Sequence, residues 1–279
     1  GRWRLPPGVT LAVWLPFWLL FAVDLRRGIS RLRAPVDHRP PESVSVVIPA
    51  RNEGAGAGEC VRAALRDRHV MEAILVDGGS IDDTPLQAVQ AGARVIRHDA
   101  PPGAGGGRGG QIRAGVAAAE GDVVAVVHAD TRVAADEFGR MLALLRQQPM
   151  IVGGAIGGCF QGRGIPLRLL EAANDFRAVF LGISFGDQVQ FFRRRPAAAA
   201  DLYPDIPLME DVELSLRLQG LGRTAFLFGE AEISARRWRS GVSRRAGLII
   251  RLFASYLWQR LFGPPDTLAM YRKYYGGER

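Results

Sequence analysis

The stretch Val123-Val-Ala-Val-Val-His-Ala-Asp130 decides the fold of this chain of 279 residues. Its first five residues are apolar and predict a buried strand, which breaks into a short acidic turn that ends in Asp130. In an α/β protein, ligands bind at the carboxyl ends of parallel strands. A carboxylate at such a place can hold a divalent metal ion to which a diphosphate also binds. The function of the chain therefore depends on what Asp130 does.

Strands and helices alternate on both sides of this stretch. Further strands are expected over 44–48, 73–76, 94–96, 151–160, 189–192, 225–228 and 232–236. Helices are expected over 58–66, 111–119, 167–181 and 209–219, and one more begins at 82–85. This alternation indicates parallel βαβ units, so we expect an α/β fold with a mostly parallel, open, twisted sheet that helices flank.

The composition indicates a basic globular protein. Lysine and arginine number 36 against 28 acidic residues, which gives a net charge of +8. A basic protein can bind anionic membranes, nucleic acids or phosphate-bearing substrates. The central chain has no basic stripe interleaved with aromatic residues, so nucleic acid is not an expected partner. The only two cysteines, Cys60 and Cys159, provide neither a disulfide framework nor a metal-ligand spacing, and both are expected to be buried.

Two apolar segments suggest contact with a membrane. Residues 11–23 are apolar apart from Pro16 and are followed by several arginines, but a full span needs roughly 20 apolar residues. We therefore expect an interfacial or re-entrant anchor, with a helix packed on the domain surface as the alternative. Residues 248–262 predict a basic, aromatic, amphipathic helix suited to the headgroup region, and the alternative is a helix that faces the core.

Acidic side chains follow three of the expected strands. Glu53 comes after the first strand, Asp77 after the second and Asp130 after the fourth. Because the carboxyl ends of parallel strands line one edge of a sheet, we expect these carboxylates to converge on one crevice. Such a cluster suits a metal ion together with a nucleotide. Each residue alone could equally be a helix cap or a turn former.

Four motifs in this order resemble the family 2 glycosyltransferases of the GT-A fold. They are S-V-V-I-P-A-R-N-E (45–53), L-V-D-G-G-S-x-D-D-T (75–84), H-A-D-T (128–131) and M-E-D-V-E-L-S-L-R (209–217). The resemblance covers roughly residues 43–240. It implies a sugar transferase that uses a nucleotide-diphosphate donor and a Mg²⁺ or Mn²⁺ ion.

The resemblance also implies roles for individual residues. Asp130 would ligate the metal ion, and Asp211, beside Glu210, would be the general base for the acceptor hydroxyl. His128 stands where many members of the family have the first aspartate of a D-x-D motif, and we expect it to line the nucleotide site. The expected donor-binding residues are Pro49, Ala50, Asn52, Glu53, Asp77, Gly78, Arg108, His128 and Ala129.

Two further segments are expected on the side of the acceptor and the diphosphate. Gly186, Asp187 and Gln188 resemble a segment that borders the acceptor pocket in relatives. Arg236, Arg237 and Trp238 resemble the end of the Q-x-x-R-W motif of membrane-associated members. The glutamine of that motif is missing here, because Ile233 stands in its place.

A glycine-rich loop provides an alternative hypothesis. Residues 105–110 match G-x-G-x-x-G, which suggests a dinucleotide site and an NAD(P)-dependent oxidoreductase. The loop follows the third strand rather than the first, however, and such a loop can also place backbone N–H groups near a phosphate. A non-catalytic membrane protein that binds a sugar nucleotide is a third hypothesis.

The preferred interpretation is a membrane-associated, metal-dependent, inverting glycosyltransferase at the cytoplasmic face of the cell membrane. It would move a sugar, with UDP as the expected carrier, to a hydroxyl of a lipid or other hydrophobic acceptor. Three regions are expected: an anchor and basic linker over 1–40, a GT-A domain over 41–240, and an interfacial helix and tail over 241–279.

Overall fold

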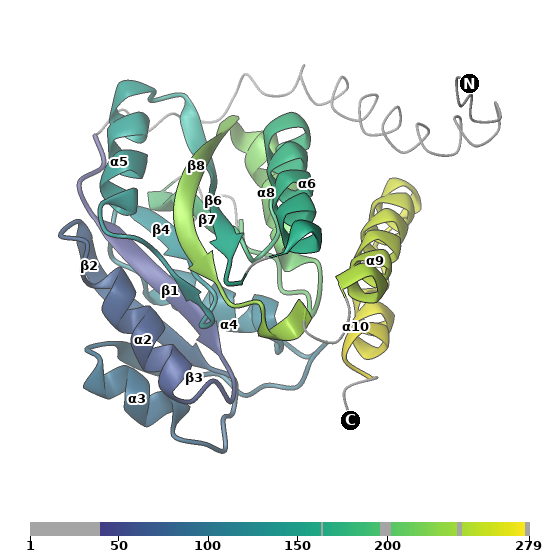
Figure 1. Cartoon of the computed structure of the whole chain (residues 1–279), viewed down its shortest axis with the longest axis horizontal. Helices are drawn as coiled ribbons and strands as arrows, with labels where there is room; N and C mark the ends of the chain where they lie inside the picture. The colour runs from purple at the N-terminus through teal and green to yellow at the C-terminus, as the bar shows by residue number, and fades with distance from the viewer. Residues whose placement is uncertain (1–39, 163, 196–201, 239–241, 277–279) are drawn as a thin grey trace.

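The computed structural model describes residues 40–162, 164–195, 202–238 and 242–276 (Figure 1). The first half contains β1 (Val44–Ala50), α2 (Ala55–Ala64), β2 (Val70–Asp77), α3 (Thr84–Gln90), β3 (Arg94–Arg97), α4 (Arg108–Ala118), β4 (Val123–Val126), β5 (Thr131–Arg132) and α5 (Glu137–Gln147). The second half contains β6 (Ile151–Phe160), α6 (Ile165–Leu181), β7 (Val189–Arg193), α8 (Glu210–Leu221), β8 (Arg223–Ile233), a 3₁₀ turn (Arg236–Trp238), α9 (Val242–Phe262) and α10 (Thr267–Tyr275). The anchor expected at 11–23 lies outside the described residues.

One eight-stranded sheet runs through the molecule in the order β3-β2-β1-β4-β7-β6-β8-β5. Strands β3, β2, β1 and β4 are parallel to one another, which confirms the expected βαβ units. Strand β7 is antiparallel to both of its neighbours, and β6 and β8 form a further parallel pair. The sheet therefore has a parallel half, made by residues 44–126, and a mixed half, made mainly by the rest of the chain.

Alternate residues of the central strands pack on opposite faces of the sheet. On one face, Val46 and Ile48 lie in a core that helices α2, α3 and α5 complete. On the other face, Val47 packs with Ile112 of α4 and Leu214 of α8. Burial on both faces explains why these strands are apolar throughout.

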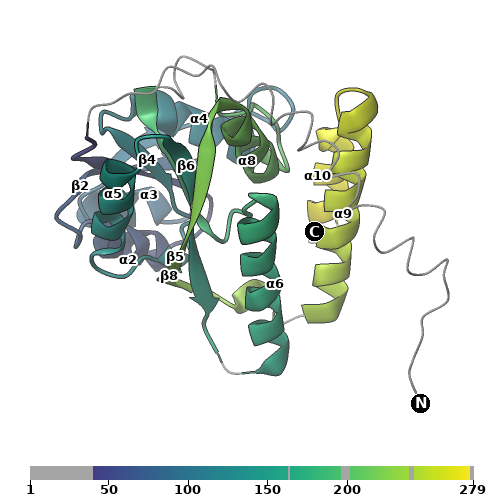
Figure 2. The same ribbon diagram turned by 90° about the horizontal axis from the view of Figure 1, so that it is seen from above.

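A third, smaller core joins the carboxyl-terminal helices to the domain. Val212 of α8, Leu252 and Tyr256 of α9 and Met270 of α10 are buried together. In the views of Figures 1 and 2, α9 and α10 lie beyond α6 and α8, on the outside of the domain. Within the described part of the chain, no helix is both long enough and apolar enough to cross a membrane.

The structure differs from the sequence-based expectations in several places. The expected strands 225–228 and 232–236 are one strand, β8, and an irregularity in its pairing with β6 lies between Leu227 and Ala231. Helices α5 and α10 were not expected. The prediction that both cysteines are buried was half wrong, since Cys60 is buried and Cys159 on β6 is exposed.

Candidate active site

The loops after β1, β2 and β4 lie side by side at one edge of the sheet, as predicted. The backbone N–H of Gly78 donates to the carbonyl of Ala50 at 2.9 Å, which joins the first two loops. Gln111, a residue that the sequence analysis missed, donates from its side-chain amide to the carbonyls of both Ala50 and Val76 at 3.0 Å. These bonds hold the ends of β1 and β2 in register where the expected donor-binding residues begin.

The residues of the β1 loop are held in an unusual backbone conformation. Asn52 has φ of 55°, a left-handed value that is rare for a residue other than glycine. Its side-chain oxygen accepts a hydrogen bond from Ile81, and its own N–H donates to Ser80. The N–H of Glu53 donates to Thr84 Oγ1 at 2.8 Å. The loop after β2 therefore holds Asn52, and the first residue of α3 holds Glu53.

Asp77 is almost completely buried, with 4% of its surface exposed. Both of its carboxylate oxygens accept from the N–H of Ser80 at 3.2 Å. The carboxylate is thus held at the carboxyl end of β2, in the place from which a nucleoside would be bound. Asp77 does not line the central cavity described below, so its expected role in holding the nucleoside stays a prediction.

An arginine from the end of the mixed half reaches the acidic cluster. The Nη2 atom of Arg236 contacts the carboxylate of Glu53 and lies 3.8 Å from Oδ2 of Asp130. The pKa of the buried Cys60 thiol is raised, first by burial and then by the negative charges of Asp130 and Glu53. Both carboxylates therefore lie close to one small region, and a guanidinium supplies positive charge there.

The same region fits a divalent metal ion that a diphosphate helps to hold. Asp130 offers the oxygen ligand that Mg²⁺ and Mn²⁺ prefer. The contact with Arg236 shows that a cation is accommodated between Asp130 and Glu53. Among the residues that the structure describes, no group of three or more His, Cys, Asp or Glu side chains could hold a metal by itself. Asp130 would thus depend on phosphate and water oxygens for the remaining ligands.

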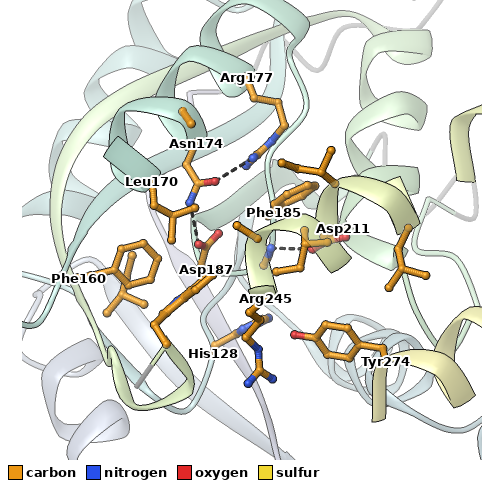
Figure 3. A pocket seen from close by; sticks show the side chains of 18 of the residues that line it. His128, Phe160, Leu170, Asn174, Arg177, Phe185, Asp187, Asp211, Arg245 and Tyr274 are labelled. Carbon is orange, nitrogen blue, oxygen red and sulfur yellow. Dashed lines mark hydrogen bonds between the residues drawn. The ribbon is translucent and has the colours of Figure 1, made fainter. Parts of the chain in front are cut away.

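Asp211 lies in the first turn of α8 and lines the central cavity described below. Its Oδ2 accepts from the N–H of Gly186 at 2.7 Å, and its Oδ1 accepts from Val212 at 2.8 Å. Met209, the residue directly before α8, has φ of 64° and is a second left-handed residue in the site. Figure 3 shows a hydrogen bond to Asp211 at the wall of the cavity. A carboxylate fixed in this way is positioned to accept a proton from a bound hydroxyl.

Glu210 is turned away from the cavity and is completely buried. It forms an ion pair with Arg108, the first residue of α4. Burial raises the pKa of the Glu210 carboxyl, and the positive charge of Arg108 opposes this effect. The predicted catalytic role of Glu210 is therefore better described as positioning: it holds Arg108, which does line the cavity.

The central cavity has a volume of about 210 Å³ and lies between the sheet edge, α6, α8 and α9. Its lining combines polar residues of the predicted site with apolar residues from the second half of the chain (Figure 3). The predicted residues in its lining are Arg108, His128, Asp130, Gly186, Asp187, Asp211 and Trp238. Trp238 packs edge-on against Phe160, with the ring centroids 5.7 Å apart. One cavity therefore joins Asp130 to Asp211.

The sequence analysis missed a polar cluster on α6. Asn174 donates to Asp187 Oδ2 at 2.8 Å and accepts from Arg177 at 2.8 Å (Figure 3). The Arg177 guanidinium also lies 3.4 Å from the centroid of the Phe185 ring. Burial lowers the pKa of Arg177 to about 10 and raises the pKa of Asp187. The signal in the sequence was the recurrence of polar residues every three positions along α6, at Arg168, Glu171, Asn174 and Arg177.

Three residues predicted for the acceptor and diphosphate side have different surroundings: Gly186, Gln188 and Arg237. Gly186 approaches the ring of His128 so closely that a Cβ atom would lie 2.3 Å from the ring carbon Cε1. Gln188 is buried and directs its side chain to Asp175 and Arg177 rather than into the cavity. The side chain of Arg237 is outside the described residues.

The glycine-rich loop is explained by close packing. A Cβ atom on Gly110, the last glycine of the pattern, would lie 1.9 Å from the carbonyl oxygen of Gly105. A Cβ atom on Gly109 would lie 2.3 Å from the carbonyl oxygen of Ile206, in the segment that leads to α8. The loop thereby places Arg108 beside Glu210 at the cavity. The glycines are required for this approach of backbone to backbone, so the G-x-G-x-x-G pattern needs no dinucleotide to account for it.

Comparison with known proteins identifies relatives of one kind. The family model described as glycosyl transferase family 2 matches residues 45–200. The chain is similar to glucosyl-3-phosphoglycerate synthase of Mycobacterium tuberculosis (strain CDC 1551 / Oshkosh), with 32% identity over 168 residues, 53% of this chain and 48% of the relative. It is also similar to beta-monoglucosyldiacylglycerol synthase of Synechocystis sp. (strain ATCC 27184 / PCC 6803 / Kazusa), with 27% identity over 244 residues, 75% of this chain and 50% of the relative. The chain thus spans about half the length of these curated relatives.

Solved structures have the same fold. Glucosyl-3-phosphoglycerate synthase from Mycobacterium tuberculosis, in complex with Mg²⁺ and UDP, is 22% identical, with a TM-score of 0.55 over 86% of this chain and 85% of that chain. The mannosyltransferase PcManGT from Pyrobaculum calidifontis, in complex with GDP-Man and Mn²⁺, is 17% identical, with a TM-score of 0.59 over 96% of this chain and 79% of that chain. These similarities confirm the predicted GT-A type of α/β fold.

Proposed function

The chain belongs to glycosyl transferase family 2, and from this premise we propose that it moves a sugar from a nucleotide-diphosphate donor to a hydroxyl group of an acceptor. The observation that carries the proposal is the cavity that Asp130 and Asp211 both line, since it combines a metal-ligating carboxylate with a candidate base. Sugar transfer needs both groups: one to stabilise the leaving diphosphate and one to deprotonate the acceptor.

On the donor side, Glu53 and Asp77 would accept hydrogen bonds from the nucleoside, and Asp130 would hold the metal ion. We propose Mg²⁺ or Mn²⁺ and a UDP-sugar; the Mg²⁺ and UDP bound to the M. tuberculosis enzyme support this choice. When bound, the metal supplies positive charge that neutralises the leaving diphosphate. Arg108, which lines the cavity and is held by Glu210, is positioned to contribute a second positive charge.

On the acceptor side, Asp211 accepts the proton of the attacking hydroxyl. The N–H of Gly186 fixes one of its oxygens, which limits the directions from which a hydroxyl can approach. Asp187 and Asn174 offer further hydrogen-bond partners at the cavity wall. A single base in a single displacement predicts inversion at the anomeric carbon.

We further propose a lipid or other hydrophobic acceptor and association with the cytoplasmic face of a membrane. Phe160, Leu170, Ile249 and Leu252 contribute apolar side chains to the cavity, which suits an acceptor with an apolar part. The name of the Synechocystis relative indicates a diacylglycerol acceptor, whereas that of the M. tuberculosis relative indicates phosphoglycerate. The acceptor is therefore the part of the proposal that most needs a direct test.

The test is to incubate the full chain with a panel of nucleotide sugars, Mn²⁺ and membrane lipid extract, and to detect glycosylated products by mass spectrometry. A sugar-bearing lipid that depends on one donor is the expected result. Asp130→Ala should abolish the metal-dependent reaction, and full activity in that variant would contradict the site assignment. The absence of any product or donor hydrolysis would favour the alternative of a non-catalytic sugar-nucleotide binder.

A further inference from the structure

Helix α6 exposes its apolar side. Ile165, Leu169, Phe176 and Phe180 have exposed fractions of 76%, 65%, 52% and 69%. These residues are separated by four, seven and four positions, which places them on one side of the helix. Of the 17 residues in α6, only Asn174 and Ala178 are buried. The apolar stripe is therefore not part of any core that the described residues form.

The polar side of the same helix faces the protein. Glu171 accepts from the N–H of Phe160 at 2.6 Å. Asn174 and Arg177 lie in the cluster around Asp187. A helix on the surface of a water-soluble domain normally has the opposite arrangement, with the apolar stripe toward the core. This reversal indicates that an apolar environment covers the outer side of α6.

Helix α9 exposes a second apolar stripe. Ile250, Trp258, Leu261 and Phe262 have exposed fractions of 64%, 56%, 42% and 75%. Their spacing places them on one side of the helix, opposite the side from which Tyr256 packs into the third core. Large exposed apolar residues in this number on two helices mark a binding surface.

The two helices that carry the stripes border the same cavity. Leu170 and Arg177 of α6 and Ile249 and Ile250 of α9 line it. Because Ile250 both lines the cavity and is exposed, the stripe on α9 begins at the rim of the cavity. Figure 2 shows α6 and α9 next to each other on the side of the molecule away from α2 and α3. A surface that covered both stripes would also cover the cavity mouth.

The charge of this region indicates what the surface binds. Residues 242–275, which form α9, α10 and their connection, contain six basic residues and one acidic residue, Asp266. Among the basic residues, Arg244, Arg251, Arg272 and Lys273 are exposed. A second copy of the chain would bring the same positive charge against this face, which is unfavourable. An anionic lipid surface complements both the charge and the apolar stripes.

We propose that α6 and α9 together form the docking surface for an anionic lipid bilayer, onto which the cavity opens. Ile165, Leu169, Phe176 and Phe180 enter the headgroup region beside Trp258 and Phe262, and the basic residues contact lipid phosphates. The inference rests on the proposed function in one respect, the purpose of docking. Docking would let a lipid acceptor reach Asp211 without crossing water. Binding itself requires neither a donor nor a reaction.

The test is flotation of the full chain with vesicles of phosphatidylcholine alone or with added phosphatidylglycerol. The expected result is binding to the anionic vesicles that weakens by about tenfold or more in the variant Phe176→Ser/Phe180→Ser. The matched control is Leu86→Ser/Val89→Ser, which removes two equally exposed apolar residues from α3 and should bind as wild type does. Equal binding of the two double variants would overturn the proposal.

Flotation reports lipid binding by the whole chain, so another lipid-binding segment could hide the effect of a substitution in α6. Hydrogen–deuterium exchange reports on α6 and α9 directly. Anionic vesicles should protect peptides from α6 and α9 and leave α3 unchanged, whereas unchanged exchange in α6 would overturn the proposal. Sedimentation velocity without lipid should show a monomer for the wild type; a dimer that the Phe176→Ser/Phe180→Ser variant dissociates would assign the stripe to a second copy instead. If the protein bound anionic vesicles as expected but transferred no sugar, the result would contradict the proposed function and leave the docking proposal standing.

Discussion

The guanidinium of Arg236 lies 3.8 Å from the carboxylate of Asp130, and the same Nη2 atom contacts Glu53. Glu53 follows β1, Asp130 follows β4, and Arg236 follows β8, so three distant parts of the chain meet here. The arginine offsets the repulsion between two carboxylates at the sheet edge. It therefore occupies the region that a metal ion would share with Asp130, and the two cations compete for the same negative charge.

Replacing Arg236 should strengthen metal binding in the absence of nucleotide. In Arg236→Ala, the competing positive charge is gone, so the affinity for free Mn²⁺ should rise several-fold; electron paramagnetic resonance of unbound Mn²⁺ measures it directly. The rise should shrink at high salt, because the Arg236 side chain is 44% exposed and its interactions are screened. Arg94→Ala, which removes an exposed arginine on β3, is the control and should leave Mn²⁺ affinity unchanged.

Asp211→Asn should separate donor binding from transfer. The amide cannot accept the acceptor proton, and loss of a general base typically costs 10²- to 10⁴-fold in rate. Titration with UDP and Mn²⁺ should still give wild-type affinity, since Asp211 is not among the residues proposed to bind the donor. A variant that transfers sugar at the wild-type rate would show that another group is the base.

Arg108→Met should make the stability of the protein depend on pH. Burial already raises the pKa of Glu210 above its ordinary value of 4.5, and loss of the opposing Arg108 charge should raise it further. The folded state then binds a proton that the unfolded state releases, so the free energy of unfolding should fall as pH rises above about 4.5 toward the raised pKa. The slope should approach about 1.4 kcal/mol per pH unit in urea denaturation between pH 5 and pH 7.

A double variant provides the control for this slope. Glu210→Gln in the Arg108→Met background removes the titrating group and leaves a neutral side chain of similar size. Between pH 5 and pH 7, the free energy of unfolding of this double variant should change with pH only as much as that of the wild type does. If the slope remained, a group other than Glu210 would be responsible.

Gly186→Ala should disturb the base without disturbing the fold. The new methyl group would lie 2.3 Å from Cε1 and 2.5 Å from Nε2 of His128, so either the His128 ring or the 186 loop must move. The ring lines the cavity, and the loop carries the N–H that holds Asp211, so either movement changes the surroundings of the base. A displacement of about 1 Å at a catalytic group can reduce the rate on the order of 100-fold. Steady-state kinetics and thermal denaturation measure the two effects separately.

Gly220→Ala is the matched control, since this glycine lies in α8 and nothing is within 4 Å of the position of its Cβ atom. It should leave the rate unchanged and stabilise the helix by about 0.5–1 kcal/mol. Equal kinetic effects of the two substitutions would show that the contact between Gly186 and His128 does not position the base.

The donor side of the site could be predicted from the sequence because each of its residues directly follows a strand. Glu53, Asp77 and Asp130 need only the parallel order of β1, β2 and β4 to converge, and apolar strands that alternate with helices predict that order. Helix α5 could also have been predicted from the sequence. Its buried apolar residues recur at helical spacing: Phe138, Met141, Leu142 and Leu145.

The acceptor side could not be predicted in the same way. Asn174 and Arg177 reach the cavity because α6 lies against β6 with its polar side inward, an orientation that its composition alone does not determine. Gln188 lies in a segment that the sequence assigned to the pocket, but its side chain points to Arg177. The contact between Arg236 and Glu53 spans 183 positions of the chain, so only the tertiary fold reveals it.

The change from parallel to antiparallel pairing at β7 has a consequence for how specificity can evolve. The residues proposed for the donor lie within 49–130, on the strands and loops of the parallel half and at the start of α4. Those proposed for the acceptor lie within 160–252, in the mixed half and the helices beyond it. Suppose that the second half of the chain were exchanged for that of another protein. The backbone hydrogen bonds that would have to form again with the first half are mainly those between β4 and β7 and between β5 and β8. The chain is thus built so that a new acceptor can be acquired by remodelling one segment while the sugar carrier stays the same, and chimeras joined in the loop between α5 and β6 are a natural way to alter its products.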